Sequence, residues 1–403
     1  MTRRVVITAM GLASPVGDTP DACFDALIAG ACGVMPHPDP AIGRDVGYVR
    51  GDMTANLPGN QAIMLDRVSH LALYAAKQAL EAGRLGTEQQ AECGVFVGTG
   101  IGGVSTLCDA VGAFHDKILR RAQLVIPAVM PNAPAAHIAQ HMTSTQEAQT
   151  YATACTAGAV AIGEAFRRIR DGYLDVALAG GTEAMLRPEL MQAWGQLQVL
   201  CRDASAEPYG GCRPFSKGRT GFALGEGAAM LLLETYEHAM ARGATPIAEV
   251  CGYGVSNDGT HPLRPNPSGQ ALAIARAMQQ AGLAPEDVGY INAHATGTLT
   301  GDRVETAAIR QVFGQAADRL AVSSIKGAIG HLIGAGGAVE TAVTALALQR
   351  QVLPPTLRFE GGDPQCDLDY VPNQARRVEG LSAALSNSFG MGGNNAVLAL
   401  RGV

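Results

Sequence analysis

The chain has 403 residues, of which 47% are hydrophobic and 16% charged, with 30 basic against 36 acidic side chains. This length and apolar content exclude a small module or a disordered chain and favour a compact enzyme or an obligate oligomer. The net charge of −6 argues against nucleic acid as a partner, and no apolar stretch approaches the roughly 20 residues that cross a membrane. The N-terminus lacks the apolar run of a secretory signal, so we predict a cytoplasmic protein.

Short apolar runs alternate with segments of helical periodicity, a pattern typical of an α/β protein. The predicted strands, in chain order, are Val5–Ala9, Cys93–Val97, Asp175–Ala179, Gly227–Leu233, Ile247–Tyr253, Gly289–Ala293, Leu320–Ser324, Leu381–Ser386 and Ala396–Leu400. Predicted helices include Ser69–Ala82, Ser268–Gly282 and a helix that begins at Cys155 and stops near Gly172. No linker rich in proline and serine separates domains, so we expect two halves, 1–245 and 246–403, that share one core.

The first motif, Thr153–Gly158, places Cys155 among small residues at the start of an amphipathic helix. A helix N-terminus favours an anion, so it is expected to lower the pKa of the thiol and make a thiolate available near neutral pH. Small neighbours leave room for an acyl chain. An arbitrary cysteine is more often a buried structural residue, but this context favours a nucleophile.

Two histidines follow predicted strands in the second half, where the strand ends of an α/β sheet bring side chains together around ligands. One is His294, within Asn292–Thr298, and the other is His331, within Lys326–Gly337. Polar residues accompany both, namely Asp302 and Glu305 after His294, and Lys326 before His331. Taken alone, His294 is better explained as an ordinary loop residue, and Lys326 and His331 could be polar residues with no chemical role.

The last motif is a glycine-rich turn, Ser386–Asn395, between the last two predicted strands. Backbone N–H groups in such a turn can point into a site and form an oxyanion hole. An ordinary tight hairpin explains the same residues equally well.

Together these four contexts resemble the β-ketoacyl-acyl carrier protein synthases, the decarboxylating condensing enzymes of the thiolase-like superfamily. The resemblance runs from Val5–Gly11 to Asn394–Leu398 and includes Arg213–Phe215 and Gly221–Gly227. The Cys-His-His set is that of the elongating branch, whereas the initiating branch uses Cys-His-Asn and the thiolases carry a second catalytic cysteine. The resemblance implies a thiolase-like α/β fold, with duplicated halves in a five-layer αβαβα arrangement.

The resemblance also implies a role for each matched residue. Cys155 accepts the acyl group, while His294 and His331, neutral and donating Nε–H, stabilise the enolate that forms as malonyl loses carbon dioxide. The backbone N–H groups of Cys155 and Met391 form the oxyanion hole. Lys326 belongs to the catalytic set and, with Glu305 and Asp302, to a supporting polar shell. The other matched residues surround this centre, with Thr296 and Thr298 binding pantetheine, and Ile101, Phe389 and Met391 forming the acyl pocket and gate.

The implied reaction is decarboxylative Claisen condensation of an acyl thioester with malonyl-acyl carrier protein, in fatty-acid or polyketide biosynthesis. No dissociable cofactor or metal is expected, because 4′-phosphopantetheine arrives on the carrier protein. The expected partners are the acyl carrier protein and a second ketosynthase-like chain, in a homodimer or a heterodimer. The alternative is a non-catalytic partner subunit that shapes chain length, but such subunits generally lack the nucleophile that Cys155 provides.

Several positions depart from the family pattern. Met391 stands where elongating enzymes usually have a second phenylalanine, which gates the acyl site. The other departures are Asn394–Asn395 for Thr-Asn, Ala295–Thr298 for Gly-Thr-Ser-Thr, Ser216 and Thr220 for two aspartates, and a segment, Gln61–Arg67, that is poorer in basic residues. These changes leave the catalytic residues in place and bear on acyl specificity and carrier docking.

Two further patterns resemble unrelated sites. Gly98–Gly103 satisfies G-x-G-x-x-G after a strand, but no acidic residue ends a following strand about 20 residues on, so we predict no dinucleotide site. His137 and His141 lie four apart on a predicted helix, but Ile138 stands where a zinc protease needs glutamate. We interpret both as surface or interface histidines.

Overall fold

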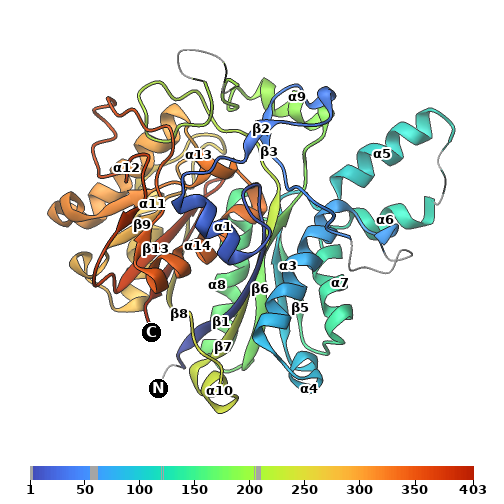
Figure 1. Ribbon diagram of the computed structural model, residues 1–403, viewed down its shortest axis with the longest axis horizontal. Helices are drawn as coiled ribbons and strands as arrows, with labels where there is room; N and C mark the ends of the chain where they lie inside the picture. Colours follow the sequence, from blue (N-terminus) through green and yellow to red (C-terminus); the bar gives the residue numbers. More distant parts are fainter. Residues whose placement is uncertain (1–2, 55–61, 119, 121, 204, 206–209) are drawn as a thin grey trace.

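The computed structural model describes residues 3–54, 62–118, 120, 122–203, 205 and 210–403. Their main feature is one ten-stranded mixed sheet made of two five-stranded halves (Figure 1). The first half contains β1 (Val5–Ala13), β4 (Gly94–Gly98), β5 (Ala148–Tyr151), β6 (Val176–Glu183) and β7 (Gly227–Thr235). The second contains β8 (Ala248–Asn257), β9 (Tyr290–Asn292), β10 (Ala321–Ser323), β13 (Ala383–Phe389) and β14 (Asn394–Arg401).

The two halves have the same topology. The strand order is β5-β4-β6-β7-β1 in the first and β10-β9-β13-β14-β8 in the second. Counted along the chain, the second strand of each half pairs in parallel with the third and the fourth strands. The fifth strand pairs antiparallel with the fourth and the first. Antiparallel pairing of Val5–Ile7 with Ala248–Val250 joins the halves. The expected duplication is therefore confirmed, while the division after residue 245 stays a prediction.

Helices complete the five layers. In the central layer, α8 (Ala157–Arg170) and α14 (Gly336–Arg350) contact each other and strands of both halves. Every residue of α14 up to Leu348 is buried, because sheet or helix lies on all its sides. The outer layers are α3 (Arg67–Gly83) and α7 (Ala133–Met142) on the first half, and α11 (Pro267–Ala281) and α12 (Leu299–Phe313) on the second (Figure 1).

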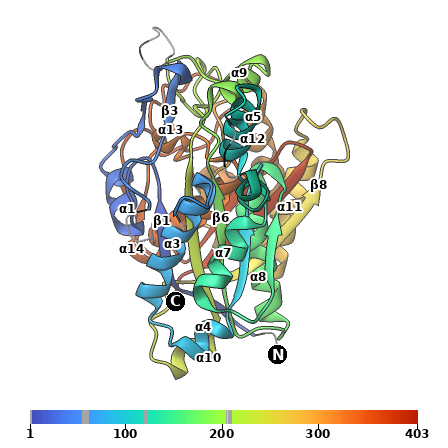
Figure 2. The same cartoon turned by 90° about the vertical axis from the view of Figure 1, so that its right-hand side faces the viewer.

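The remaining elements decorate this layered body. Helices α5 and α6 project away from it on the right of Figure 1, the side that faces the viewer in Figure 2. The smaller elements are α1 (Pro20–Ile28), β2 (Val34–Pro36), β3 (Asp45–Gly47), α4 (Thr87–Ala91), α5 (Val104–His115), α6 (Val125–Val129), α9 (Pro188–Gln196), α10 (Tyr236–Ala241), α13 (Lys326–Ile329), β11 (Val352–Leu353) and β12 (Arg376–Arg377). Within the described part of the chain, no helix is both long and apolar enough to cross a membrane.

All nine predicted strands are present with shifted ends, and β5 was not predicted. Strands β1, β6 and β8 each extend four residues beyond their predicted ends, and β1 continues through Gly11 to Ala13. Gly11 permits close packing: a Cβ atom at this position would lie 1.9 Å from the carbonyl oxygen of Ala75 in α3. The glycine thus serves helix–sheet contact rather than a turn.

Candidate active site

Cys155 lies in the turn between β5 and α8, at the junction of the two halves. The turn is a short 3₁₀ helix, Ala154–Thr156, and Ala154 takes a left-handed φ of 53°. Such a conformation is strained for a residue with a Cβ, so the surrounding structure must hold it. Gly158 lets α8 approach the second half, since a Cβ there would lie 2.8 Å from the carbonyl oxygen of Gly334. Cys155 is 6% exposed as a result.

The two predicted histidines come together with Cys155 around one cavity of about 410 Å³. The ring centroids of His294 and His331 lie 5.3 Å apart, with their planes at 84°. Phe222 packs edge-on against His331 at 5.1 Å, and Phe389 packs against His294 at 6.0 Å. The volume is typical of a site for an organic ligand.

Most of the other predicted residues line the same cavity, namely Thr296, Thr298, Glu305, Phe389 and Met391. Ile101 does not, and in the single chain its side chain is 44% exposed. The reason lies in the backbone after β4, where the N–H groups of Gly100 and Ile101 turn inward to the carboxylate of Glu183. The side chain of Ile101 is therefore exposed in the single chain, and its expected place in the acyl pocket stays a prediction.

Both histidines are neutral at physiological pH. Burial holds the pKa of His294 and of His331 well below the ordinary value, and the positive charge of Lys326 lowers both further. Within the described residues, neither ring nitrogen of His331 has a hydrogen-bond partner, nor has Nδ1 of His294. Buried polar atoms are rarely left unpaired, so these nitrogens are suited to binding a ligand.

The environment of Cys155 corrects our expectation of a thiolate near neutral pH. Burial raises the pKa of the Cys155 thiol to about 11, and the nearby Glu183 raises it too. Backbone N–H groups of Met391 and of Cys155 itself act on the sulfur and lower its pKa, as does the charge of Lys326. Desolvation outweighs these favourable effects, so the free enzyme holds a thiol.

Lys326 pairs with Glu340 of α14, a residue that was not predicted to belong to the site. Both side chains of this ion pair are 1% exposed. Burial raises the pKa of Glu340 to about 7 against the opposing effect of Lys326. A signal was present in the sequence, because Glu340 is the one acidic residue in a helix made mostly of small and apolar residues.

Glu305 holds the loop that carries His294. Its Oε1 accepts a 2.9 Å hydrogen bond from the His294 N–H, and its Oε2 accepts a 2.7 Å bond from the Ala295 N–H. The Asn387 side chain donates a third bond, of 3.1 Å, to Oε1. Burial raises the pKa of Glu305 to about 7 despite these donors. Its contacts fit the supporting role expected of it.

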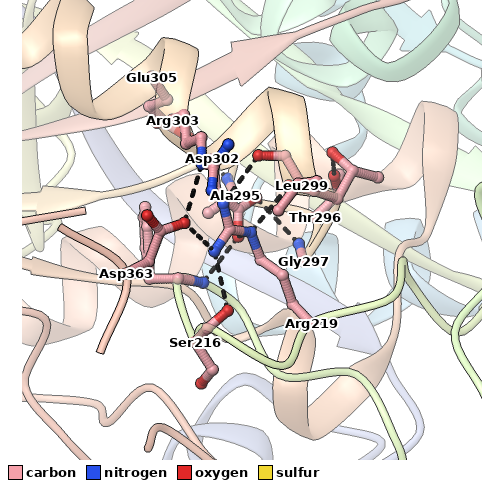
Figure 3. A network of polar contacts seen from close by, with 12 residues as sticks. Ser216, Arg219, Ala295, Thr296, Gly297, Leu299, Asp302, Arg303, Glu305 and Asp363 are labelled. Atoms are coloured by element: carbon pink, nitrogen blue, oxygen red, sulfur yellow. Dashed lines mark hydrogen bonds and ion pairs between the residues drawn. The ribbon is translucent and has the colours of Figure 1, made fainter. Parts of the chain in front are cut away.

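Asp302 belongs to a buried polar network that also contains Arg219 and Asp363 (Figure 3). It accepts a 3.0 Å hydrogen bond from the Gly297 N–H and lies 3.3 Å from Nε of Arg219. Arg219 also pairs with Asp363 at 2.8 Å and donates to the Thr298 carbonyl oxygen at 3.0 Å. The network fixes the backbone that presents Thr298 to the cavity. Arg219 and Asp363 were not predicted, because their partners are distant in sequence.

The remaining sequence patterns have structural explanations. The Gly98–Gly103 turn is tied to the second half by Glu183, which accepts hydrogen bonds from Gly100 at 2.6 Å and Gly334 at 3.0 Å. On α7, His137 is partly buried and His141 is exposed, and among the described residues no three His, Cys, Asp or Glu side chains group as metal ligands. Of the segment Gln61–Arg67, which is expected to bear on carrier docking, Gln61 lies outside the described residues.

Two family models together cover most of the chain. The model described as "Beta-ketoacyl synthase, N-terminal domain" matches residues 2–239, and "Beta-ketoacyl synthase, C-terminal domain" matches residues 247–360. The chain belongs to the β-ketoacyl synthase family. It is therefore a ketosynthase, an enzyme of the acyltransferase class.

Individual relatives agree with this assignment. The chain is 39% identical to 3-oxoacyl-[acyl-carrier-protein] synthase 2 of Synechocystis, over 99% of this chain and 98% of that protein. The solved ishigamide ketosynthase/chain length factor superposes with a TM-score of 0.91 at 31% identity, covering both chains fully. A type II polyketide ketosynthase, solved with its acyl-carrier protein, superposes with a TM-score of 0.90 at 29% identity, again over both chains. These structures confirm the thiolase-like fold.

Proposed function

We propose that this chain condenses an acyl group, carried on Cys155, with malonyl-acyl carrier protein to give a β-ketoacyl thioester. The observation that carries the proposal is the meeting of Cys155, His294 and His331 around one cavity, with the N–H groups of Cys155 and Met391 at the sulfur. The product would be two carbons longer, made for fatty-acid or polyketide biosynthesis.

The first step in this proposal is acyl transfer. The sulfur of Cys155 attacks the thioester carbonyl carbon of the incoming acyl chain, and the C–S bond to the pantetheine arm breaks. The thiol proton of Cys155 passes to the departing pantetheine sulfur. The N–H groups of Cys155 and Met391 stabilise the negative charge on the carbonyl oxygen during the attack.

The second step is decarboxylation followed by condensation. Loss of carbon dioxide from malonyl thioester leaves a carbanion, whose charge is delocalised onto the thioester oxygen. Neutral His294 and His331 donate N–H bonds to that oxygen, which a low pKa makes possible without a buried charge. The carbanion then attacks the acyl carbonyl on Cys155, and the released thiolate takes up a proton.

The setting of the reaction belongs to the same proposal. The relatives named above support the acyl carrier protein as substrate carrier and a second ketosynthase-like chain, identical or related, as partner. No dissociable cofactor is required, because the thioester, Cys155 and the pantetheine arm supply all the reacting groups. We place the enzyme in the cytoplasm, where a carrier protein and malonyl thioesters are made.

The alternative of a non-catalytic subunit that shapes chain length lacks a comparable observation. A subunit that only forms a pocket needs neither a cysteine aimed into it nor two neutral histidines beside that cysteine. The buried Lys326–Glu340 pair, which helps to keep those histidines neutral, would likewise have no purpose there.

The deciding experiment is mass spectrometry of the protein after incubation with acyl-carrier protein, followed by addition of malonyl-carrier protein. We expect one acyl group on Cys155 and its conversion to a β-ketoacyl product. Cys155→Ala should abolish both signals, while Cys93→Ala, which removes another buried cysteine, should retain them. Acylation or condensation by Cys155→Ala would refute the proposal.

A further inference from the structure

A buried carboxamide that the mechanism above does not use faces the catalytic cavity. Gln270 lies near the start of α11, is 2% exposed and lines the same cavity as Cys155 and the two histidines. Its Oε1 has no hydrogen-bond partner within the described residues. A buried amide oxygen of this kind normally has a partner, since an unpaired one is costly to desolvate.

The polar residues around Gln270 are already paired with one another. The Asn395 side chain donates a 2.7 Å hydrogen bond to Oδ1 of Asp258, and the Asn266 N–H donates a 3.0 Å bond to Oδ2. Ser256 donates a 2.6 Å bond to the Gly269 carbonyl oxygen. A Cβ at Gly269 would lie 2.0 Å from Asp258, so this part of α11 is tightly fixed. Gln270 is the member of this region whose oxygen is left for something in the cavity.

The chemistry of Gln270 narrows what that ligand can be. A primary carboxamide offers a donor and an acceptor side by side and carries no charge. The matching ligand group is a secondary amide, which offers a carbonyl oxygen and an N–H in return. A phosphate or carboxylate would be better served by arginine, and an alkyl chain would be better served by an apolar residue such as methionine.

We infer that Gln270 is a positioning residue that hydrogen-bonds a secondary amide of the pantetheine arm. The inference rests on the proposed function, which brings that arm into this cavity. Thr296 and Thr298, whose hydroxyls lie 3.1 Å apart, line the same cavity and provide further polar contacts for the arm. By holding the amide, Gln270 would set how far the thioester carbon reaches toward Cys155.

The test compares Gln270→Met, which keeps length and volume, with Gln279→Met, which makes the same change at an exposed position of α11. The substrates are the acyl thioesters of pantetheine (two amides), of N-acetylcysteamine (one amide) and of butanethiol (none). For Gln270→Met we expect kcat/KM for acylation of Cys155 to fall about 10- to 100-fold on an amide-bearing thioester, mainly through KM. The butanethiol thioester should be unaffected, and Gln279→Met should resemble wild type throughout.

Each outcome of the series has a defined meaning. Loss on both amide-bearing thioesters assigns Gln270 to the amide nearest the sulfur, and loss on acyl-pantetheine alone assigns it to the farther one. Equal loss on all three thioesters, or no loss on any, overturns the inference. If wild-type Cys155 is not acylated by any of them, the proposed function fails instead.

Thermal unfolding gives an independent readout of the same inference. Replacing an unpaired buried amide by methionine should leave the melting temperature of the free enzyme unchanged or raise it, because no internal bond is lost. A clear fall in the melting temperature of Gln270→Met would make the residue structural and contradict the inference.

Discussion

The turn before α8 and the turn before α14 occupy equivalent places in the two halves, and they contact each other. Each contains a three-residue 3₁₀ helix whose first residue has a left-handed φ, 53° at Ala154 and 44° at Ile333. The next residue is Cys155 in the first half and Gly334 in the second. The same turn conformation thus carries a nucleophile in one half and a glycine, which has no side chain, in the other.

The difference follows from the space around each turn. A Cβ at Gly334 would lie 2.5 Å from the amide nitrogen of Gly100, so no side chain fits there. The Gly334 N–H instead donates to Glu183, which ties the two halves together. At Cys155 the side chain reaches the cavity. The comparison teaches that duplication supplies the backbone, while the room left by neighbours decides which turn performs chemistry.

The sharpest test of the first turn is the reactivity of its thiol. With a pKa of about 11, Cys155 should be alkylated by iodoacetamide about tenfold faster for each pH unit from 7 to 10, because the thiolate is the reactive form. The whole range then spans roughly 1000-fold. Peptide mass spectrometry after timed quenching measures the rate at Cys155 alone.

The urea-unfolded chain is the control for this measurement, since its cysteines should level off near their ordinary pKa of 9.0. A plateau for folded Cys155 near pH 7 would instead show that the helix N-terminus dominates over burial. The two turns would then differ in how well they stabilise a negative charge, as well as in the room that they leave for a side chain.

The second turn can be tested through His331, which precedes Gly334. His331→Ala, like His294→Ala, should reduce malonyl decarboxylation about 100- to 1000-fold, as expected for loss of one donor to a developing oxyanion. Acylation of Cys155 should fall much less. Release of labelled carbon dioxide and acyl transfer are assayed separately, with His137→Ala on α7 as the matched control. Equal losses in the two assays would make a histidine the base for the thiol.

Lys326 and Glu340 allow the electrostatic part of the second half to be altered without touching the reacting atoms. Lys326→Met should raise the pKa of both histidines, because its charge disfavours their protonated forms. Activity requires neutral histidines, so the acid limb of the decarboxylation profile should move to higher pH. The rate should therefore fall on the acid side of the profile and change little near pH 8.

Lys326→Met also leaves Glu340 buried without its partner, which should destabilise the fold by about 3–5 kcal/mol. The double variant Lys326→Met with Glu340→Gln should recover most of that stability in urea unfolding and still show the shifted acid limb. A double variant with the wild-type pH profile would show that Lys326 has only a structural role.

How far the sequence predicts this molecule depends on how local each signal is. Strand β7 was predicted because Gly227–Leu233 is an unbroken run of small and apolar residues, which can be buried on both faces. Strand β5, Ala148–Tyr151, was missed because it is a sheet edge with a polar, partly exposed sequence and no alternation. Pairing with β4 forms it, and that pairing is a tertiary interaction.

The same distinction applies to the site. Cys155, His294 and His331 could be recognised from short motifs, each read within a few neighbouring residues. Lys326 and Glu340 are 14 residues apart, and Arg219 and Asp363 are far more distant, so their pairing follows only from the fold. The high pKa of the thiol was missed for the same reason, since burial by both halves cannot be read from a helix start.

Met391, whose backbone contacts Cys155 in the first turn, is expected to give the smallest effect. Its N–H acts on the sulfur of Cys155, and its side chain lines the cavity. Met391→Phe keeps that N–H, so the chemical step should change little. Phenylalanine is a rigid plate, whereas methionine is unbranched and rearranges easily, so a methionine gate should open more readily for bulky or polyunsaturated chains. Replacing it should shift relative kcat/KM among saturated, polyunsaturated and short acyl-carrier proteins by several-fold, and an unchanged ranking would reduce Met391 to simple packing.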